Sequence, residues 1–401
     1  MAKLAIKGGR ALRDVRAHPW PQWPVWGDED MQGLMEVLES GSWSYNGPKE
    51  RRFNQAFAKF VGTDYAIGVA NGTVSLQLAL EACEIGWGHE VILPGLTWQA
   101  TAGAVLDANA VPVLVDVCED TWCIDPACIE AAITPRTKAI MPVHLYGCFA
   151  DMDAIMPIAH KHGLRVIEDC AHKHGGEWKG QRAGSIGDIG SFSFQLSKLM
   201  TAGEGGALTT SDVALYEKLD ALRNCGRRPE ADQVHEESIG FYGDEGNFCQ
   251  SGNYRITDFQ AALLLENLKR LPAQNKLRDE NAIYLNALLA ERPGITPMRR
   301  DVRETREAYF NFVFRYDQAE FKGLPVDRFR EALGKEIGCT VEACYEPLNQ
   351  CSLYAPHTKP ARHRITPEYW EQIDPKRFAL PVSERAFNAE SVCVHFNVLM
   401  D

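Results

Sequence analysis

The chain has 401 residues, 45% of them hydrophobic and 24% charged, which is typical of a globular protein with core enough for about two or three domains. Its net charge is −12 and it has no basic stripe interleaved with aromatics, so we expect no nucleic-acid or membrane-surface partner. It shows neither an apolar leader nor an apolar run of about eighteen residues, so we expect a cytoplasmic protein without membrane spans.

The twelve cysteines are never closer than the four-residue gap between Cys118 and Cys123. That spacing fits zinc ligands poorly, and several cysteines, such as Cys170 and Cys393, lie in apolar runs where a thiol behaves as a small hydrophobe. We expect reduced thiols and no metal.

Short apolar runs alternate with helical patterns, such as Val74–Glu84 and Met152–His162, over the first two-thirds of the chain. This alternation predicts an α/β sheet covered by helices on both faces. The predicted strands are Tyr65–Ala70, Glu90–Pro94, Val113–Val117, Ala139–His144, Leu164–Asp169, Ile189–Phe194 and Gly206–Thr209. Ligands of such sheets bind beyond the carboxyl ends of the strands. The polar segments expected there are Asn71-Gly72-Thr73, Thr97-Trp98, His144, Asp169 and Ser193.

The pattern changes after a long amphipathic helix, predicted over Asp258–Leu271 and continuing beyond Pro272 to about Leu289. A strand over Ala308–Tyr316, a helix over Val326–Ile337 and a strand over Val392–Leu399 follow. We therefore expect a large α/β domain over 1–270, which includes the N-terminal segment, and a smaller α+β domain over 271–401.

Asp169 ends an apolar strand in the run Val166–His172. A carboxylate is costly to bury there unless a cation pairs with it. The protonated nitrogen of a pyridine ring is such a partner, and keeping that nitrogen protonated makes the ring an electron sink. The alternative is that Asp169 only caps the next helix.

Lys198 follows the next strand and lies among apolar and small residues. Such neighbours desolvate the amine and lower its pKa, which makes it a usable nucleophile. Alone, such a lysine is more often a surface residue. One strand after Asp169, it suits covalent binding of an aldehyde cofactor such as pyridoxal 5'-phosphate. The glycines of Thr201–Gly206 precede a strand rather than a helix, which argues against a dinucleotide site.

Asn71-Gly72-Thr73 opens a helix directly after a strand, where exposed backbone amides suit a phosphate, although a simple helix cap explains the same residues. Trp98 follows another strand and could stack on a flat heteroaromatic ring, although a lone tryptophan is more often a core residue.

Taken in order, these segments resemble the DegT/DnrJ/StrS sugar aminotransferases, which are fold type I pyridoxal-phosphate enzymes, from about Leu4 to the end. The matching motifs are Asn71-Gly72-Thr73, Pro142–Gly147, Glu168–His172, Ser191–Lys198 and Gly252–Arg255. The resemblance implies a large α/β/α sandwich domain with a smaller C-terminal domain. It also implies that the active unit is a homodimer with shared active sites.

The resemblance further implies roles for individual residues. Lys198 would bind the cofactor covalently, Asp169 would pair with its pyridine nitrogen, and His172 would contact its ring hydroxyl. Gly72, Thr73 and Ser193 would hold its phosphate, Trp98 would stack on its ring, and Asn253 would reach the phosphate in the neighbouring subunit. Cys225 receives no role, because many family members have Asn-His-Gly where this chain has Asn224-Cys225-Gly226.

The segments Lys198–Gly206 and Pro381–Arg385 are similar to the branch that aminates keto-cyclitols such as scyllo-inosose with L-glutamine, in aminocyclitol antibiotic biosynthesis. Two alternatives keep the cofactor: an aminohydroxybenzoate-synthase-like dehydratase or aromatase, and a nucleotide-linked keto-sugar aminotransferase. The second is disfavoured because Leu199-Met200 follows the lysine, where such enzymes typically have an asparagine. A non-catalytic protein on this fold is disfavoured by the intact Lys198 and Asp169.

A small acceptor needs several polar contacts, and the candidates are His144, Tyr45 and Arg255. We expect acceptor specificity to reside in the segments Gly41–Lys49, Gln233–Ser251 and Tyr345–His363.

Overall fold

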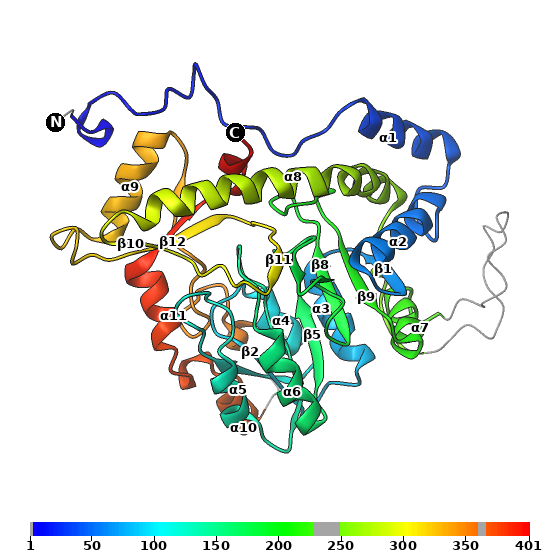
Figure 1. The fold of residues 1–401 in the computed structure, drawn as a ribbon. Coiled ribbons are helices and arrows are strands. Elements are labelled where there is room, and N and C mark those ends of the chain that lie inside the picture. The colour runs from blue at the N-terminus through cyan, green and yellow to red at the C-terminus, as the bar shows by residue number, and fades with distance from the viewer. Residues whose placement is uncertain (1–2, 228–248, 360–365) are drawn as a thin grey trace.

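A computed structural model describes residues 3–227, 249–359 and 366–401 (Figure 1). Its centre is a seven-stranded sheet with the strand order β1-β9-β8-β5-β4-β2-β3. Only β9 runs antiparallel to its neighbours. The strands are β1 (Tyr65–Val69), β2 (Glu90–Pro94), β3 (Val111–Val115), β4 (Thr137–Ile140), β5 (Arg165–Asp169), β8 (Ile189–Ser193) and β9 (Gly206–Thr210). The α/β sheet predicted from the sequence is confirmed.

Two apolar cores lie on opposite faces of this sheet, because side chains alternate between faces along each strand. In β2, Ile92 belongs to one core while Val91 and Leu93 belong to the other. The first core contains residues of α2 (Pro48–Val61), α5 (Pro126–Ala132), α6 (Met152–His162) and α8 (Asp258–Ala290). The second contains residues of α3 (Gly72–Ala82), α4 (Ala100–Asp107) and α7 (Val213–Arg223). Helices therefore cover both faces, as the continuous apolar strands predicted.

Helix α8 is the long helix expected from the sequence, and it continues without interruption through Pro272. It begins with a capping box, in which the Thr257 side chain accepts the Gln260 amide and the Gln260 side chain accepts the Thr257 amide. In Figure 1 it runs along the top of the molecule from the large sheet to a smaller one.

The smaller sheet is four-stranded and antiparallel, with the order β10-β12-β14-β13. Its strands are β10 (Ile295–Pro297), β12 (Phe312–Tyr316), β13 (Val341–Glu342) and β14 (Ser391–Val394), and α9 (Val326–Ile337) lies against it. This is the predicted α+β part of the chain. The division at residue 270 stays a prediction, because α8 crosses it. The N-terminal segment packs on α9, where the Ala5 amide donates to Glu336 Oε1 at 2.7 Å.

Three predicted strands are wrong in part: the one expected over Ala139–His144 ends at Ile140, and the one over Ala308–Tyr316 begins at Phe312. The strand expected over Val392–Leu399 ends at Val394, and a 3₁₀ helix, η6 (Phe396–Met400), follows it. His395 caps this helix by accepting the Asn397 amide at 3.3 Å, and the buried residues Phe396 and Leu399 are three apart, the repeat of a 3₁₀ helix. The apolar run therefore reflects two short elements instead of one strand.

Shorter elements complete the described chain. They are η1 (Ala5–Lys7), α1 (Asp28–Ser40), β6 (Glu177–Trp178), β7 (Gln181–Arg182), β11 (Glu304–Arg306), η2 (Pro356–Thr358), α10 (Pro367–Ile373), η4 (Pro375–Arg377), α11 (Pro381–Arg385) and the π-helical turn η5 (Ala386–Glu390). Strands β11, β6 and β7 form a three-stranded sheet of their own. Among the described residues, no helix is long and apolar enough to cross a bilayer. Each of the twelve cysteines is a free thiol, as expected.

Candidate active site

Asp169 lies at the carboxyl end of β5 and is 5% exposed. Thr101 Oγ1 donates to its Oδ2 at 2.9 Å, and the Ala171 amide donates to its Oδ1 at 3.2 Å. Burial raises the pKa of Asp169 above its usual value, although these hydrogen bonds and the charge of Lys198 oppose the rise. A carboxylate in this position is therefore poised for a cationic partner.

Lys198 lies in the turn that follows β8, and its backbone amide donates to Gln195 O at 2.9 Å. Its side chain is buried, and the ammonium nitrogen lies 4.4 Å from the centre of the Phe310 ring. Burial lowers the pKa of Lys198 to about 8, and the charge of Asp169 opposes that change. A substantial fraction of this amine is consequently neutral and nucleophilic near neutral pH.

His172 is held on three sides. Its Nδ1 accepts the Tyr146 amide at 3.3 Å, its Nε2 lies 3.1 Å from the Tyr345 hydroxyl, and its ring stacks on Phe310 at 3.9 Å. Burial lowers the pKa of His172 well below its usual value, so the ring is neutral. Because Nδ1 is an acceptor, the proton resides on Nε2 and points to Tyr345.

Two of these neighbours, Phe310 and Tyr345, were not identified from the sequence. Phe310 lies just before β12, and Tyr345 lies three residues after β13, so both come from the C-terminal third of the chain. Tyr345 also lies within the segment expected to carry specificity. Residues 360–363 of that segment and 233–248 of Gln233–Ser251 lie outside the described residues.

The predicted phosphate site lies at the amino end of α3. Asn71 caps the helix by accepting the Val74 amide at 2.9 Å, and the preceding helical amides, those of Gly72 and Thr73, have no partner within the helix. Ser193, at the end of β8, packs directly against this turn, because a Cβ on Gly72 would lie 2.6 Å from Ser193 Cβ. The structure thus brings Gly72, Thr73 and Ser193 together at a helix terminus that suits an anion.

Trp98 is 44% exposed, and its ring is tilted against Tyr345 with centroids 5.5 Å apart. Trp98 is therefore not a buried core residue, which was the alternative interpretation of this tryptophan. Its neighbour Tyr345 also contacts His172. Stacking of Trp98 on a cofactor stays a prediction.

Asn253 is exposed and pairs with Asn224 in an isolated antiparallel bridge. The same segment runs beside the end of β1, since Tyr254 O accepts the Ala70 amide at 2.8 Å. Asn253 therefore lies on a segment that adjoins its own subunit's phosphate turn.

Of the candidate acceptor contacts, His144 is wrong. It is fully buried, its Nδ1 accepts the Ala150 amide at 3.2 Å, and its Nε2 donates to Glu168 Oε2 at 3.0 Å. Glu168 in turn accepts the amides of Gly184, Ile186 and Gly187. His144, Glu168 and Cys170 place ligand atoms within 4.8 Å of one another. The hydrogen bonds of the histidine and the carboxylate account for this cluster, and we assign no metal to it.

The other two candidates, Tyr45 and Arg255, do lie together. The Arg255 guanidinium lies 4.9 Å from the centre of the Tyr45 ring, and its Nη1 donates to Asn224 Oδ1 at 2.7 Å. This pair lies beside the Asn224–Asn253 bridge.

These residues fit pyridoxal phosphate. A nucleophilic lysine suits its aldehyde, a buried carboxyl with a raised pKa suits its pyridinium nitrogen, and a helix terminus lined by Gly72 and Ser193 suits its phosphate.

The sequence profile of the DegT/DnrJ/EryC1/StrS aminotransferase family matches residues 24–392. The chain is 42% identical, over 393 residues, to an L-glutamine:2-deoxy-scyllo-inosose aminotransferase of Streptoalloteichus tenebrarius, covering 95% of this chain and 90% of that protein. It is 42% identical to an L-glutamine:scyllo-inosose aminotransferase of Streptomyces griseus, covering 96% of this chain and 91% of that one. The crystal structure of 3-amino-5-hydroxybenzoic acid synthase is similar with a TM-score of 0.80 and 34% identity, covering 98% of this chain and 95% of that one. The chain thus belongs to the DegT/DnrJ/EryC1/StrS family and is a pyridoxal-phosphate-dependent aminotransferase.

Proposed function

We propose that the protein transfers the α-amino group of L-glutamine to a ring ketone of a scyllo-inosose-type cyclitol, a step in making an aminocyclitol. The observation that carries this proposal is the 42% identity, over about the whole chain, to relatives named for that reaction. The pairing of Tyr45 with Arg255 supports it, because a small polyhydroxylated acceptor needs several hydrogen-bonding groups.

The proposed roles of the residues follow from their surroundings. When bound, pyridoxal phosphate supplies the aldehyde that takes the amino group and the ring that accepts charge from the donor's α-carbon. Lys198 binds the cofactor through its neutral amine and, once the donor has displaced it, takes the proton from the donor's α-carbon; in the second half of the reaction it returns a proton to the acceptor carbon that gains the amino group. Asp169 keeps the pyridine nitrogen protonated. We assign His172, which Tyr146, Phe310 and Tyr345 hold in place, the contact with the ring hydroxyl.

The remaining proposed groups bind and place the cofactor. Gly72, Thr73 and Ser193 hold its phosphate at the start of α3, and Trp98 stacks on its ring. Their clustering at the carboxyl ends of β1, β2 and β8 supports this assignment.

We also propose a homodimer that shares its two sites, with Asn253 reaching the partner's phosphate. An exposed apolar stripe on α1, formed by Met31, Met35 and Leu38, supports an interface, since such a stripe is unusual on a monomer surface. The twelve free thiols support a cytoplasmic protein.

A second candidate has a specific observation in its favour. The similarity to 3-amino-5-hydroxybenzoic acid synthase, at 34% identity, suits a dehydrating and aromatising reaction on a ring. Such a reaction releases water, whereas transamination conserves the hydroxyl groups of the acceptor.

An acceptor panel separates these functions. The purified protein is incubated with L-glutamine carrying ¹⁵N at the α-amine and with scyllo-inosose, 2-deoxy-scyllo-inosose or a nucleotide-linked keto-sugar. We expect an aminocyclitol whose mass includes the label, and no product from glutamine labelled only at the side-chain amide. Efficient turnover of the nucleotide-linked sugar with none on either inosose contradicts the proposal, and loss of water from the product favours the second candidate. Lys198→Ala is the control for uncatalysed amination.

A further inference from the structure

A second buried cluster adjoins the active site and has no part in the chemistry proposed above. Lys173 follows His172 in the chain, and its ammonium is fully buried. It donates to Gly147 O at 2.6 Å, to Glu304 Oε2 at 3.0 Å and to Glu307 Oε2 at 3.1 Å. Both glutamate side chains are 1% exposed. Lys173 comes from the loop after β5, whereas the glutamates lie in and after β11, so the cluster joins segments about 130 residues apart in sequence.

The charges of this cluster balance if one glutamate keeps its proton. Burial raises the pKa of Glu307, Lys173 opposes the rise, and the neighbouring Glu304, with which Glu307 shares a hydrogen bond, adds to it. The two glutamates in turn raise the pKa of Lys173 above its usual value, against the effect of burial. Near neutral pH the cluster therefore holds a charged Lys173 and favours a proton on Glu307.

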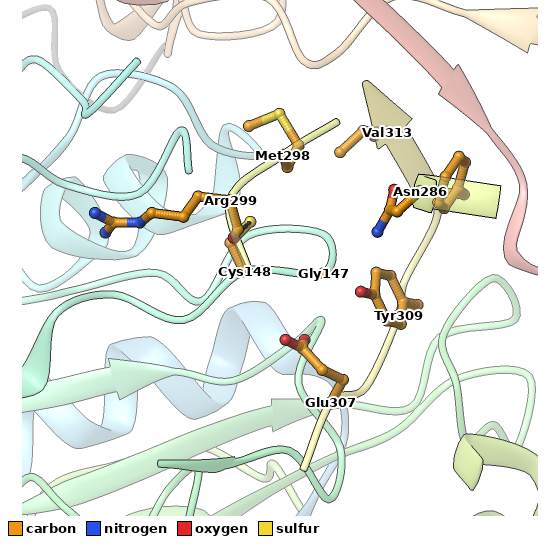
Figure 2. Close-up of a pocket in the computed structure, with 9 residues that line it drawn as sticks. Gly147, Cys148, Asn286, Met298, Arg299, Glu307, Tyr309 and Val313 are labelled. Carbon is orange, nitrogen blue, oxygen red and sulfur yellow. Dashed lines mark hydrogen bonds between the residues drawn. The ribbon is translucent and has the colours of Figure 1, made fainter. Parts of the chain in front are cut away.

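Arg300 is a further cation beside Glu307, and its charge opposes the raised pKa of that carboxyl. Arg300 Nε lies 4.0 Å from Glu307 Oε1 and is already paired with Asp279. Glu307 also lines a small cavity with Cys148 and Tyr309 (Figure 2). The volume of this cavity is about 10 Å³, room for about one water molecule.

The cluster lies next to residues that shape the active site. Three residues beyond Glu307, Phe310 stacks on His172 at 3.9 Å and lies 4.4 Å from Lys198 Nζ. The neighbouring Tyr309 packs so tightly on Gly147 that a Cβ there would lie 2.5 Å from Tyr309 Cδ1. Any shift of the segment 304–310 would therefore move the ring that contacts both Lys198 and His172.

We propose that Lys173, Glu304 and Glu307 form a buried latch that positions Phe310 against His172 and Lys198, and that the latch thereby keeps water away from the reactive amine. The inference rests on the proposed role of Lys198. Replacing Glu304 removes the charged acceptor that joins Lys173 to the Phe149 amide, and the surrounding segments then rearrange or admit water. Water beside Lys198 stabilises the ammonium form and raises the pKa of the amine.

Glu304→Gln is the sharpest test. Glutamine keeps the size of the side chain but removes the charge that accepts from both Lys173 and the Phe149 amide. The full-length chain, freed of cofactor, is labelled with traces of acetic anhydride over a range of pH, and acetylation of Lys198 is followed by peptide mass spectrometry. We expect the midpoint of this profile to rise by about one pH unit, so that labelling at pH 7 slows about tenfold. With cofactor bound, the pH at which its visible absorption changes should rise in the same direction.

Two further variants test whether the cluster acts on Lys198 through Phe310. Phe310→Ala removes the ring that the latch positions, so it should shift the profile upward as well, because burial is the larger influence on this amine. In the double variant, Glu304→Gln should add little to the upward shift that Phe310→Ala causes, because both changes act through the Phe310 ring. Glu307→Gln should shift the profile less than Glu304→Gln does, because its amide can replace the donated proton.

Glu90→Gln is the matched control. Glu90 is a buried glutamate at the start of β2 that pairs with Arg136 at 2.5 Å, far along the chain from Phe310. This variant should lose stability and leave the Lys198 profile in place. An unshifted profile in a folded Glu304→Gln protein, or in Phe310→Ala, overturns the proposal, as does an equal shift in Glu90→Gln. If Glu304→Gln does not fold, Phe310→Ala alone decides. Labelling reports the pKa of the Lys198 amine whether or not Lys198 binds the cofactor. A failure of the latch is therefore distinguishable from a failure of the role proposed for Lys198.

Discussion

Thr101 Oγ1 donates a hydrogen bond of 2.9 Å to Asp169 Oδ2, and so ties the first turn of α4 to the end of β5. Together with the Ala171 amide, it fixes both oxygens of a carboxyl whose pKa burial has raised. The protein itself thus orients the acid that we propose as the partner of the cofactor nitrogen.

Asp169→Asn should lower kcat by orders of magnitude and leave the fold intact. A neutral amide cannot hold the pyridine nitrogen protonated, so the electron sink weakens. Steady-state kinetics and thermal unfolding check this. If Asp169 only capped a helix, the variant would lose at most about 2 kcal/mol of stability and retain near-normal turnover.

Thr101→Val should have a smaller effect in the same direction. It removes one hydrogen bond to an ionised group, worth about 1.5–3 kcal/mol, which corresponds to a loss of about 10- to 100-fold in kcat if that bond acts mainly in the transition state. Thr101→Ser keeps the hydroxyl and should retain most of the activity. Equal kinetics for the valine and serine variants would show that this hydrogen bond does not serve Asp169 in catalysis.

Much of the large domain was predictable because its signals are local. Strands such as β2 and β3 are continuous apolar runs, Asp169 ends β5, and Lys198 follows β8. The amphipathic pattern of α8 likewise predicted a helix that continues beyond Pro272.

The rest of the site depends on which distant segments meet. Phe310 lies in the apolar run Ala308–Tyr316, where nothing local distinguishes a core ring from one that faces Lys198. His144 looked available at a strand end, but its partners Glu168 and Ala150 bury it. Tyr345 reaches His172 from 173 residues away in sequence, a contact that only the packing of the two sheets creates.

Gly72→Ala should impair cofactor binding more than Gly33→Ala does. An added Cβ at Gly72 would lie 2.6 Å from Ser193 Cβ and would separate α3 from β8, at a cost of about 1–3 kcal/mol. At Gly33, within α1, the nearest atom is Ala262 Cβ at an ordinary 3.7 Å. Titration of the cofactor-free proteins with pyridoxal phosphate measures the difference. Equal affinity in the two variants would argue against a phosphate site at Gly72.

Reconstitution with cofactor should accelerate as pH rises toward 8 and level off above it. Only the neutral amine attacks the aldehyde, and burial lowers the pKa of Lys198 to about 8, so its neutral fraction grows about tenfold for each pH unit below that value. Stopped-flow absorbance follows the rate. A rate that continues to rise toward about pH 10 would indicate an ordinary, hydrated lysine.

Mixing two inactive variants tests the proposed shared sites. Lys198→Ala removes the reactive amine, and Asn253→Asp places a carboxylate against the phosphate. In a two-fold dimer with exchanged Asn253, one site of a mixed dimer carries both lesions and the other carries none. Random exchange should then restore up to about a quarter of wild-type activity. No recovery despite demonstrated subunit exchange would place Asn253 in its own subunit's site, beside the β1 segment that it adjoins, or outside the site.

The identity of the cofactor-binding lysine is the central claim, and it can be measured directly. Borohydride reduction of the cofactor-loaded protein fixes the bound cofactor to its lysine, and peptide mass mapping then locates it. We expect a single modified residue, Lys198. We also expect Lys198→Ala to bind the cofactor only loosely and to lose turnover by orders of magnitude. A cofactor found on any other lysine, or near-normal turnover by Lys198→Ala, would contradict this claim.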